Sequence, residues 1–139
     1  MKIIDKDLIS MQEVRDLVES AKEAQKELAS MDQAQVDHIV RCIADAGVRN
    51  AERLARMAVE DTGFGKVKDK IVKNVFASRG VYEHIKDMKT VGEISRDDEK
   101  GLRVLAVPVG VIAGLIPSTN PTSTAFYKAE IAVKAGNAI

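Results

Sequence analysis

The sequence has few of the residues that mark a secreted or metal-binding protein. It contains one cysteine, two histidines and no tryptophan among 139 residues. A single cysteine excludes an internal disulfide and favours a reducing compartment, so we expect a cytoplasmic protein. His38 and His84 lie far apart in the chain, and no spacing of Cys, His and carboxylate side chains indicates a metal site.

A surplus of charge of either sign is also missing. Lys and Arg number 21, and Asp and Glu number 21, so the formal net charge is zero. This balance gives no reason to expect nucleic acid or an anionic membrane as a partner. Pro108, Pro117 and nearby polar residues interrupt the longest apolar stretch, and the amino end lacks an apolar signal segment, so we expect no membrane span. A P-loop and a GxGxxG motif are both absent.

The most informative stretch runs from Val107 to Ile139. Val109–Ile116 is a continuous apolar run, which is typical of a strand covered on both faces in a parallel sheet. A polar turn follows at Pro117–Pro121, then a helical segment to Ala135, and Gly136 suits the position just after a helix. A strand, a turn and a helix in this order begin a β-α-β unit, in which ligands bind at the carboxyl end of the strand. The residues after Gly136 should begin the next strand.

The polar turn has two interpretations that the residues alone leave open. Pro121 suits the first position of the helix, and Asn120 is then expected to be the N-cap. Free backbone N–H groups at this end of the helix would favour an anion or a developing oxyanion. Alternatively, the turn is a well-capped helix start whose hydroxyl groups contact only water.

Almost all charged residues precede Val104, which indicates a helical and solvent-exposed front half. We expect a first helix capped by Ser10, after a short lead over residues 1–9, with a buried stripe of Met11, Val14, Leu17, Val18, Ala21, Ala24 and Leu28. A second helix, capped by Asp32, should break near Gly47 and Asn50 and end at residues 62–65. A third helix should run over residues 66–86. Its first half is rich in lysine, at Lys66, Lys68, Lys70 and Lys73. We expect these lysines to form a solvated helix face, and a phosphate-binding patch is the less favoured alternative.

Two further local features lead to expectations. Residues 90–107 alternate in polarity on either side of a charged turn that ends at Gly101, which predicts a β-hairpin. Cys42 lies beside the apolar stripe of the second helix, and we expect a small core residue there, since a reactive thiol needs an electropositive, partly exposed setting.

Two motifs in this sequence resemble the aldehyde dehydrogenase superfamily. The first is Pro117-Ser118-Thr119-Asn120-Pro121-Thr122-Ser123-Thr124, with a helix that closes on Ala135-Gly136-Asn137. It resembles the Pro-x-Asn-x-Pro turn that opens the family's cofactor domain, and the variant is similar to that of the CoA-acylating branch. The second is Asp61-Thr62-Gly63-Phe64-Gly65-Lys66-Val67, with Asp69-Lys70 and Lys73-Asn74, which is similar to a Glu/Asp-Thr-Gly-x-Gly stretch of the same branch. The resemblance extends from about Ser10 to the end.

This resemblance implies an α/β fold of which the chain holds only a part. Residues 1–89 would form an N-terminal helical segment, and residues 90–107 a β-hairpin of the oligomerisation region of a homo-oligomer. Residues 108–139 would form the first β-α unit of a Rossmann-like NAD(P)-binding domain, which stops before its next strand. We therefore expect an amino-terminal fragment of a longer enzyme with an incomplete domain.

The resemblance also implies an activity and site residues. A CoA-acylating aldehyde dehydrogenase converts a small aldehyde, CoA and NAD or NADP to an acyl-CoA and the reduced cofactor, or runs in reverse. Its cysteine nucleophile would lie downstream, so we expect this chain alone to be inactive. The family's oxyanion-stabilising Asn aligns with Thr119, one residue before Asn120. We favour Asn120 because its amide is a donor, with Thr119 as the alternative. The cofactor candidates by position are Ile116, Pro117, Ser118 and Thr119.

Two other functions stay open. The chain could be a non-catalytic interaction module that assembles with other subunits through its hairpin and exposed apolar faces. An ordinary, non-acylating aldehyde dehydrogenase is a weaker alternative, because the Trp/Phe-Asn-Phe pattern is missing between the two prolines of the turn.

Overall fold

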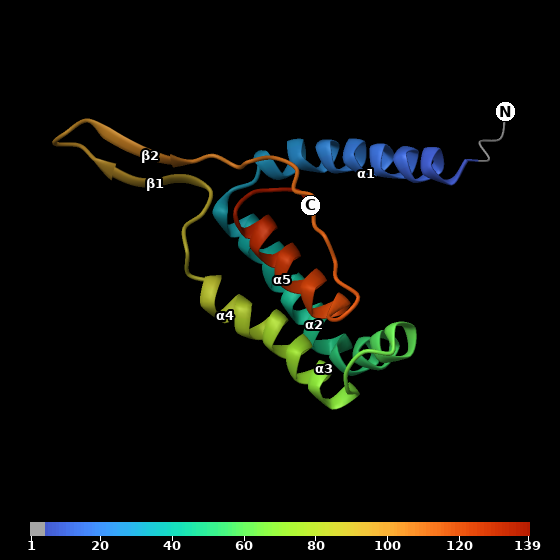
Figure 1. Ribbon diagram of the computed structural model, residues 1–139. Coiled ribbons are helices and arrows are strands. Elements are labelled where there is room, and N and C mark those ends of the chain that lie inside the picture. The colour runs from blue at the N-terminus through green and yellow to red at the C-terminus, as the bar shows by residue number, and fades with distance from the viewer. Residues whose placement is uncertain (1–4) are drawn as a thin grey trace.

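The computed structural model describes residues 5–139, and the first four residues of the expected lead lie outside that range. Over these residues, five α-helices, one π-helical turn and a two-stranded sheet follow one another (Figure 1). Their bounds are α1 Lys6–Ala29, α2 Gln33–Thr62, α3 Val67–Val75, the π-helical turn η1 Phe76–Gly80, α4 Val81–Ile85, β1 Gly92–Asp97, β2 Leu102–Ala106 and α5 Pro121–Lys134. Within residues 5–139, no helix is both long and apolar enough to cross a membrane.

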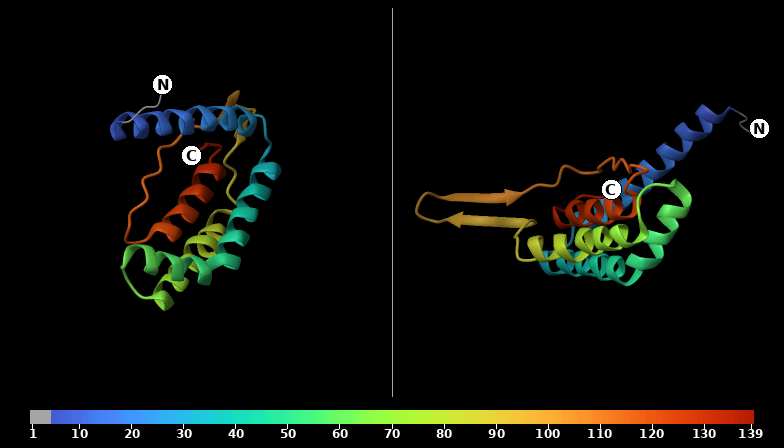
Figure 2. Two further views of the ribbon diagram at one scale, coloured as in Figure 1. Left: turned by 90° about the vertical axis from the view of Figure 1, so that its right-hand side faces the viewer. Right: turned by 60° about the horizontal axis from the view of Figure 1, so that its bottom comes forward.

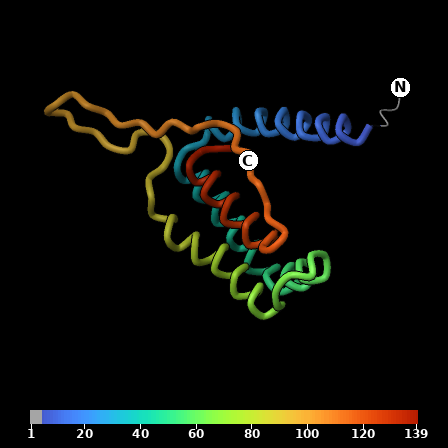
Figure 3. The backbone as a smooth tube through the Cα atoms, in the orientation of Figure 1, coloured from blue at the N-terminus to red at the C-terminus, as the bar shows by residue number. Residues whose placement is uncertain are grey.

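The body of the structure is a layer of helices around α2. In two views, α2, α5 and the rod formed by α3, η1 and α4 lie side by side, while α1 leaves across one end and the hairpin projects away (Figure 2). The apolar core consists of Leu28, Val36, Val40 and Ile85, with Tyr82 and Val133 among the residues packed against it. This arrangement brings the start of α5 against α3, although the two are distant in sequence (Figure 3).

Helix α2 begins as expected but does not break. The Asp32 side chain accepts a hydrogen bond from the Gln35 backbone N–H, and the Gln35 side chain accepts one from the Asp32 backbone N–H. These two bonds form a complete capping box. The helix then continues for 30 residues to Thr62, so the break expected at Gly47 and Asn50 is wrong. Gly47 serves close packing instead: a Cβ there would lie 2.1 Å from Ser78 Oγ. Its missing side chain lets η1 approach α2, and Asn50 Nδ2 donates to a carbonyl one turn earlier.

Helix α1 differs from expectation at its start and along its apolar stripe. It begins at Lys6, with Asp5 as the N-cap, so the cap expected at Ser10 is wrong. Leu28 is its one buried residue among those described, and Met11, Val14, Leu17 and Val18 are exposed. The stripe was expected to be buried, but α1 runs beyond the end of the helical layer, so little of the described chain covers it.

The hairpin is present where the alternation predicted it. Strands β1 and β2 pair antiparallel, from Gly92 opposite Ala106 to Asp97 opposite Leu102, with an irregularity between Glu93 and Ser95. The strands project beyond the helices, and the apolar residues Leu102, Val104, Leu105 and Val107 are exposed.

The expected strand Val109–Ile116 is extended, but among residues 5–139 it forms only one bridge. Val111 pairs with Ala138 in parallel, and the Ile112 N–H donates to the Ala138 carbonyl at 2.9 Å. A parallel neighbour after α5 was therefore correctly expected, whereas a regular strand was not found. The physical reason is that a parallel strand needs a paired neighbour along its length, and within the described part of the chain only Ala138 provides one. Helix α5 ends as predicted, with Gly136 in the left-handed conformation at φ 74°.

Candidate functional site

The polar turn before α5 is held by one face of α3. Lys70, Lys73 and Asn74 are three and four residues apart, so their side chains leave the same side of the helix. Lys70 Nζ donates to the Thr119 carbonyl at 2.7 Å, and Lys73 Nζ donates to Asn120 Oδ1 at 3.1 Å. The two sequence motifs, which are about fifty residues apart, therefore meet in one place.

Asn74 links this contact to the rest of the helical layer. Its Oδ1 accepts from Thr122 Oγ1 at 2.7 Å, and its Nδ2 donates to the Ala51 carbonyl of α2 at 2.9 Å. Asn74 is 1% exposed and Lys70 is 4% exposed, so water competes little for either side chain. The solvated face expected for the lysines is therefore wrong at Lys70, whose ammonium is buried and bound to the turn.

Asn120 occupies the N-cap position without acting as a side-chain cap. Its carbonyl accepts from the Thr124 N–H at 3.2 Å, but its side chain makes no cap hydrogen bond. The expectation that the Asn120 side chain satisfies a helix donor is therefore wrong. The Lys73 ammonium takes Oδ1 instead, because a charged donor binds an amide oxygen more strongly than a neutral backbone N–H does. Pro121 is the first helical residue, as predicted.

A hollow of about 450 Å³ opens beside this contact. Lys73 and Asn120 lie in its lining together with Ser123, and apolar and aromatic groups form much of the rest. The full lining is Lys73, Phe76, Ala77, Val81, Asn120, Ser123, Thr124 and Tyr127. A mainly apolar wall with a few polar groups is the usual composition of a site for a small organic ligand.

The remaining candidate residues of the turn are placed differently. Ile116, Pro117, Ser118 and Thr119 are exposed, and they lie between the single parallel bridge and the start of α5. Lys128 Nζ donates to the Leu115 carbonyl at 2.7 Å, which ties α5 to this segment. The structure thus brings Thr119 and Asn120 to the α3 lysines and leaves the side chains of residues 116–118 accessible.

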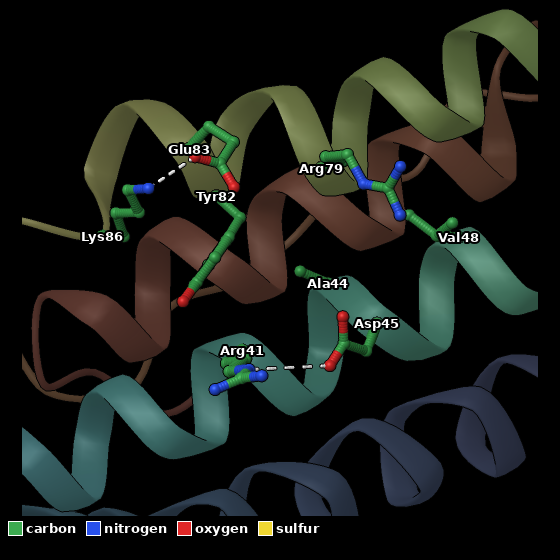
Figure 4. Close-up of a pocket in the computed structure, with 8 residues that line it drawn as sticks. All are labelled: Arg41, Ala44, Asp45, Val48, Arg79, Tyr82, Glu83 and Lys86. Carbon is green, nitrogen blue, oxygen red and sulfur yellow. Dashed lines mark hydrogen bonds and ion pairs between the residues drawn. The ribbon is translucent and has the colours of Figure 1, made fainter.

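A second hollow lies between α2 and α4 and contains none of the expected site residues (Figure 4). Its volume is about 280 Å³, and α5 passes behind it. Arg41 lies 3.9 Å from Asp45, and Lys86 lies 2.6 Å from Glu83. Apart from Tyr82, the hollow has five ionisable side chains. Four of them are paired with a partner three or four residues away in the chain, which is typical of a solvated groove.

Glu130 is a buried carboxyl that sequence reasoning missed. It is 0% exposed, and neither of its side-chain oxygens has a hydrogen-bond partner among residues 5–139. Removal from water raises the pKa of Glu130 from its ordinary value of 4.5 to about 8, so the carboxyl is protonated at neutral pH. The available signal was its spacing, because Glu130 lies one turn after the apolar Phe126 and one turn before the apolar Val133.

Cys42 does not lie in the core. It is exposed on α2, with Sγ 3.7 Å from Nε2 of the exposed His38, so the expectation of a small core residue is wrong. Ile39 and Ile43 turn toward the layer, and Cys42 falls on the outer side of that stripe. His84 is exposed as well, as expected. Over residues 5–139, no group of three or more His, Cys, Asp and Glu side chains is placed to hold a metal ion.

Comparison with known proteins identifies the family of this chain. The sequence matches the aldehyde dehydrogenase family over residues 2–139. The structure is similar to an acetylating aldehyde dehydrogenase from Geobacillus thermoglucosidasius, with 58% identity and a TM-score of 0.95 over 99% of this chain and 30% of that one. It is also similar to a probable aldehyde dehydrogenase from Listeria monocytogenes EGD-e, with 63% identity and a TM-score of 0.93 over 96% of this chain and 29% of that one.

A curated relative gives the same result. The bifunctional aldehyde-alcohol dehydrogenase AdhE of Escherichia coli (strain K12) is 49% identical over 127 residues, which are 91% of this chain and 14% of that protein. The chain thus spans about a seventh of that relative and about three tenths of the two solved structures. With its matched residues covering nearly the whole sequence, the chain belongs to the aldehyde dehydrogenase family.

Proposed function

We propose that this chain provides the amino-terminal part of a CoA-acylating aldehyde dehydrogenase. The reaction converts an aldehyde, CoA and NAD or NADP to an acyl-CoA and the reduced nicotinamide cofactor. The observation that carries the proposal is the position of Asn120, which lines a 450 Å³ hollow while Lys73 takes its Oδ1. The similarity to an acetylating enzyme supports the acylating branch.

In this proposal, Asn120 stabilises the negative charge that develops on the aldehyde oxygen. When a thiolate adds to the carbonyl carbon, the C=O bond becomes a C–O⁻ group that needs a hydrogen-bond donor. Asn120 can donate from Nδ2, because its Oδ1 is already engaged. Thr119 is the alternative donor, through its hydroxyl, but its exposed side chain lies outside the lining of the hollow. Asn120 is therefore the catalytic residue that this chain contributes.

Residues 116–119 are the part of the chain that fits a nicotinamide cofactor. They follow the segment that pairs in parallel with Ala138, and ligands of α/β sheets bind at that carboxyl end. These four residues are exposed, and in this proposal a flat ring lies against Ile116 and Pro117. When bound, the cofactor accepts the hydride that leaves the substrate. The chain's own residues hold and orient the ring, with Ser118 and Thr119 available to hydrogen bond.

The remaining parts of the proposal concern assembly. The three segments, residues 1–89, 90–107 and 108–139, would serve as a helical cover, an oligomerisation hairpin and the start of the cofactor domain. The exposed apolar residues of β2 support a homo-oligomer, because an isolated hairpin of this size is marginal in water. The single cysteine supports a cytoplasmic location.

The test uses a chimera in which residues 1–139 replace the matching part of the Geobacillus enzyme. Because the two backbones agree with a TM-score of 0.95, the chimera should fold. We expect reduction of NAD or NADP that requires both CoA and a small aldehyde, with acyl-CoA as the product. A folded chimera that reduces the cofactor without CoA would contradict the acylating assignment, and a folded but inactive one would contradict the proposal as a whole.

A second function is favoured by one observation. The outer parts of α1 and β2 expose Leu17 and Val104, respectively, and such surfaces are common at interfaces. The chain by itself would then be a non-catalytic module that binds other subunits. Co-expression with a tagged, full-length relative would recover a mixed oligomer in this case, whereas the enzymatic proposal does not require one.

A further inference from the structure

Lys73 contacts the side-chain oxygen of Asn120, Oδ1, whereas the proposed chemistry uses the side-chain NH₂ group. The Asn side chain has an oxygen that accepts and an NH₂ group that donates, whereas a lysine ammonium only donates. The atom that lies 3.1 Å from Lys73 Nζ must therefore be Oδ1, which fixes the orientation of the amide. The NH₂ group is then the part left to donate to a ligand in the hollow that both residues line.

The charge of Lys73 has a second effect. A cation at Oδ1 draws electron density from the amide and makes the N–H groups of Nδ2 stronger donors, as in other polarised hydrogen-bond chains. An oxyanion-stabilising donor gains from both effects, because it must already point correctly before negative charge develops.

The backbone of the turn is fixed by the same helix face. Lys70 holds the Thr119 carbonyl, and Asn74 holds Thr122 while being tied to Ala51 of α2. Lys70 and Asn74 are both buried, so the positions of the residues on either side of Asn120 are well determined. Lys73 is the neighbour that adds control of the Asn120 side chain itself.

We propose that Lys73 is a positioning residue, which orients and polarises the Asn120 amide so that Nδ2 is the donor to the substrate oxyanion. This inference rests on the proposed function of Asn120. It differs from a direct role for Lys73, such as binding a phosphate group of CoA, because here Lys73 acts only through Asn120.

The test is a double-mutant cycle in the chimera, with variants Lys73→Met, Asn120→Ala and their combination. We expect Lys73→Met to lower kcat roughly 10-fold to 100-fold, since a misplaced catalytic group costs up to that much, with little change in KM for CoA. In the Asn120→Ala background, the same substitution should change kcat less than about twofold, since no amide is left to orient. Lys73→Arg should retain most of the activity. Lys68→Met is the matched control, because Lys68 is an exposed lysine of the same helix, and it should match the parent.

The outcomes separate the inference from the function on which it rests. If Asn120→Ala leaves kcat unchanged, the catalytic role of Asn120 fails. The positioning role fails if Asn120→Ala lowers kcat but Lys73→Met does not. It also fails if the fold-loss of kcat in the double variant equals the product of the fold-losses in the two single variants. An increased KM for CoA with unchanged kcat would assign Lys73 to CoA binding instead. A crystal structure of the Lys73→Met chimera gives a readout apart from activity: we expect Asn120 to leave its present orientation, and an unchanged side chain would overturn the inference.

Discussion

Replacement of Glu130 by glutamine should remove a pH-dependent loss of stability from this chain. The Glu130 carboxyl is fully buried, and its oxygens have no hydrogen-bond partner among residues 5–139. Burial raises its pKa to about 8, from 4.5. The folded chain therefore keeps this proton up to about pH 8, whereas the unfolded chain releases it near 4.5. Between those values the folded state binds more protons, so the stability that the protonated group provides is complete below 4.5 and decreases as pH rises to 8.

The size of the effect follows from the shift. At about 1.4 kcal/mol per pKa unit, the shift from 4.5 to about 8 corresponds to roughly 5 kcal/mol in the free energy of unfolding. Glutamine is close in size to the protonated carboxyl and does not ionise. The Glu130→Gln variant should therefore exceed the parent in free energy of unfolding by about 1 kcal/mol at pH 5, about 3 kcal/mol at pH 7 and about 5 kcal/mol at pH 9.

The assay is urea unfolding followed by far-UV circular dichroism at these three pH values. Glu60→Gln is the matched control, because Glu60 is an exposed glutamate of α2, and it measures the effect of removing a carboxylate at the surface. A Glu130→Gln variant whose advantage over the parent is constant from pH 5 to pH 9 would refute the reasoning.

Three further predictions concern packing, an ion pair between the buried Lys134 and the partly exposed Asp37, and activity. Gly47→Ala should destabilise the chain by about 1–3 kcal/mol, measured by thermal unfolding, because the new Cβ would lie 2.1 Å from Ser78 Oγ; an unchanged midpoint would contradict the close packing of η1 on α2. Asp37→Ala should lower the free energy of unfolding, measured with urea, by about 2–4 kcal/mol more than Lys134→Met does. The reason is that Asp37→Ala leaves the Lys134 ammonium, which is 3% exposed, without its carboxylate. The reverse order would show that the ion pair contributes little to stability. The purified 139-residue chain should produce no NADH from NAD, CoA and acetaldehyde, and CoA-dependent NADH formation would overturn the assignment of the nucleophile to another part of the enzyme.

The features that could be predicted from the sequence are those that neighbouring residues determine. The capping box at Asp32, the end of α5 at Gly136 and the hairpin over residues 90–107 all depend on residues close in the chain, and all three are present. The strand Val109–Ile116 could not be predicted with the same success, because pairing needs a neighbour from elsewhere, and only Ala138 supplies one.

The contacts of the candidate site could not be predicted from the sequence. The two motifs identified the turn and α3 separately, yet their hydrogen bonds connect residues 47 to 49 positions apart. Helical spacing places Lys70 on the same side of α3 as Lys73 and Asn74, but whether that side meets water or another segment depends on where α5 packs. Gly47 was misread for the same reason, since a glycine that ends a helix and one that admits a neighbour look alike in a sequence.

The most direct test of the central claim is the turnover of the Asn120→Ala variant of the Geobacillus chimera. If Asn120 donates to the substrate oxyanion, kcat with acetaldehyde and CoA should fall roughly 10²-fold to 10³-fold, while KM for the nicotinamide cofactor changes little. A folded Asn120→Ala chimera with kcat within about twofold of the parent would contradict the account.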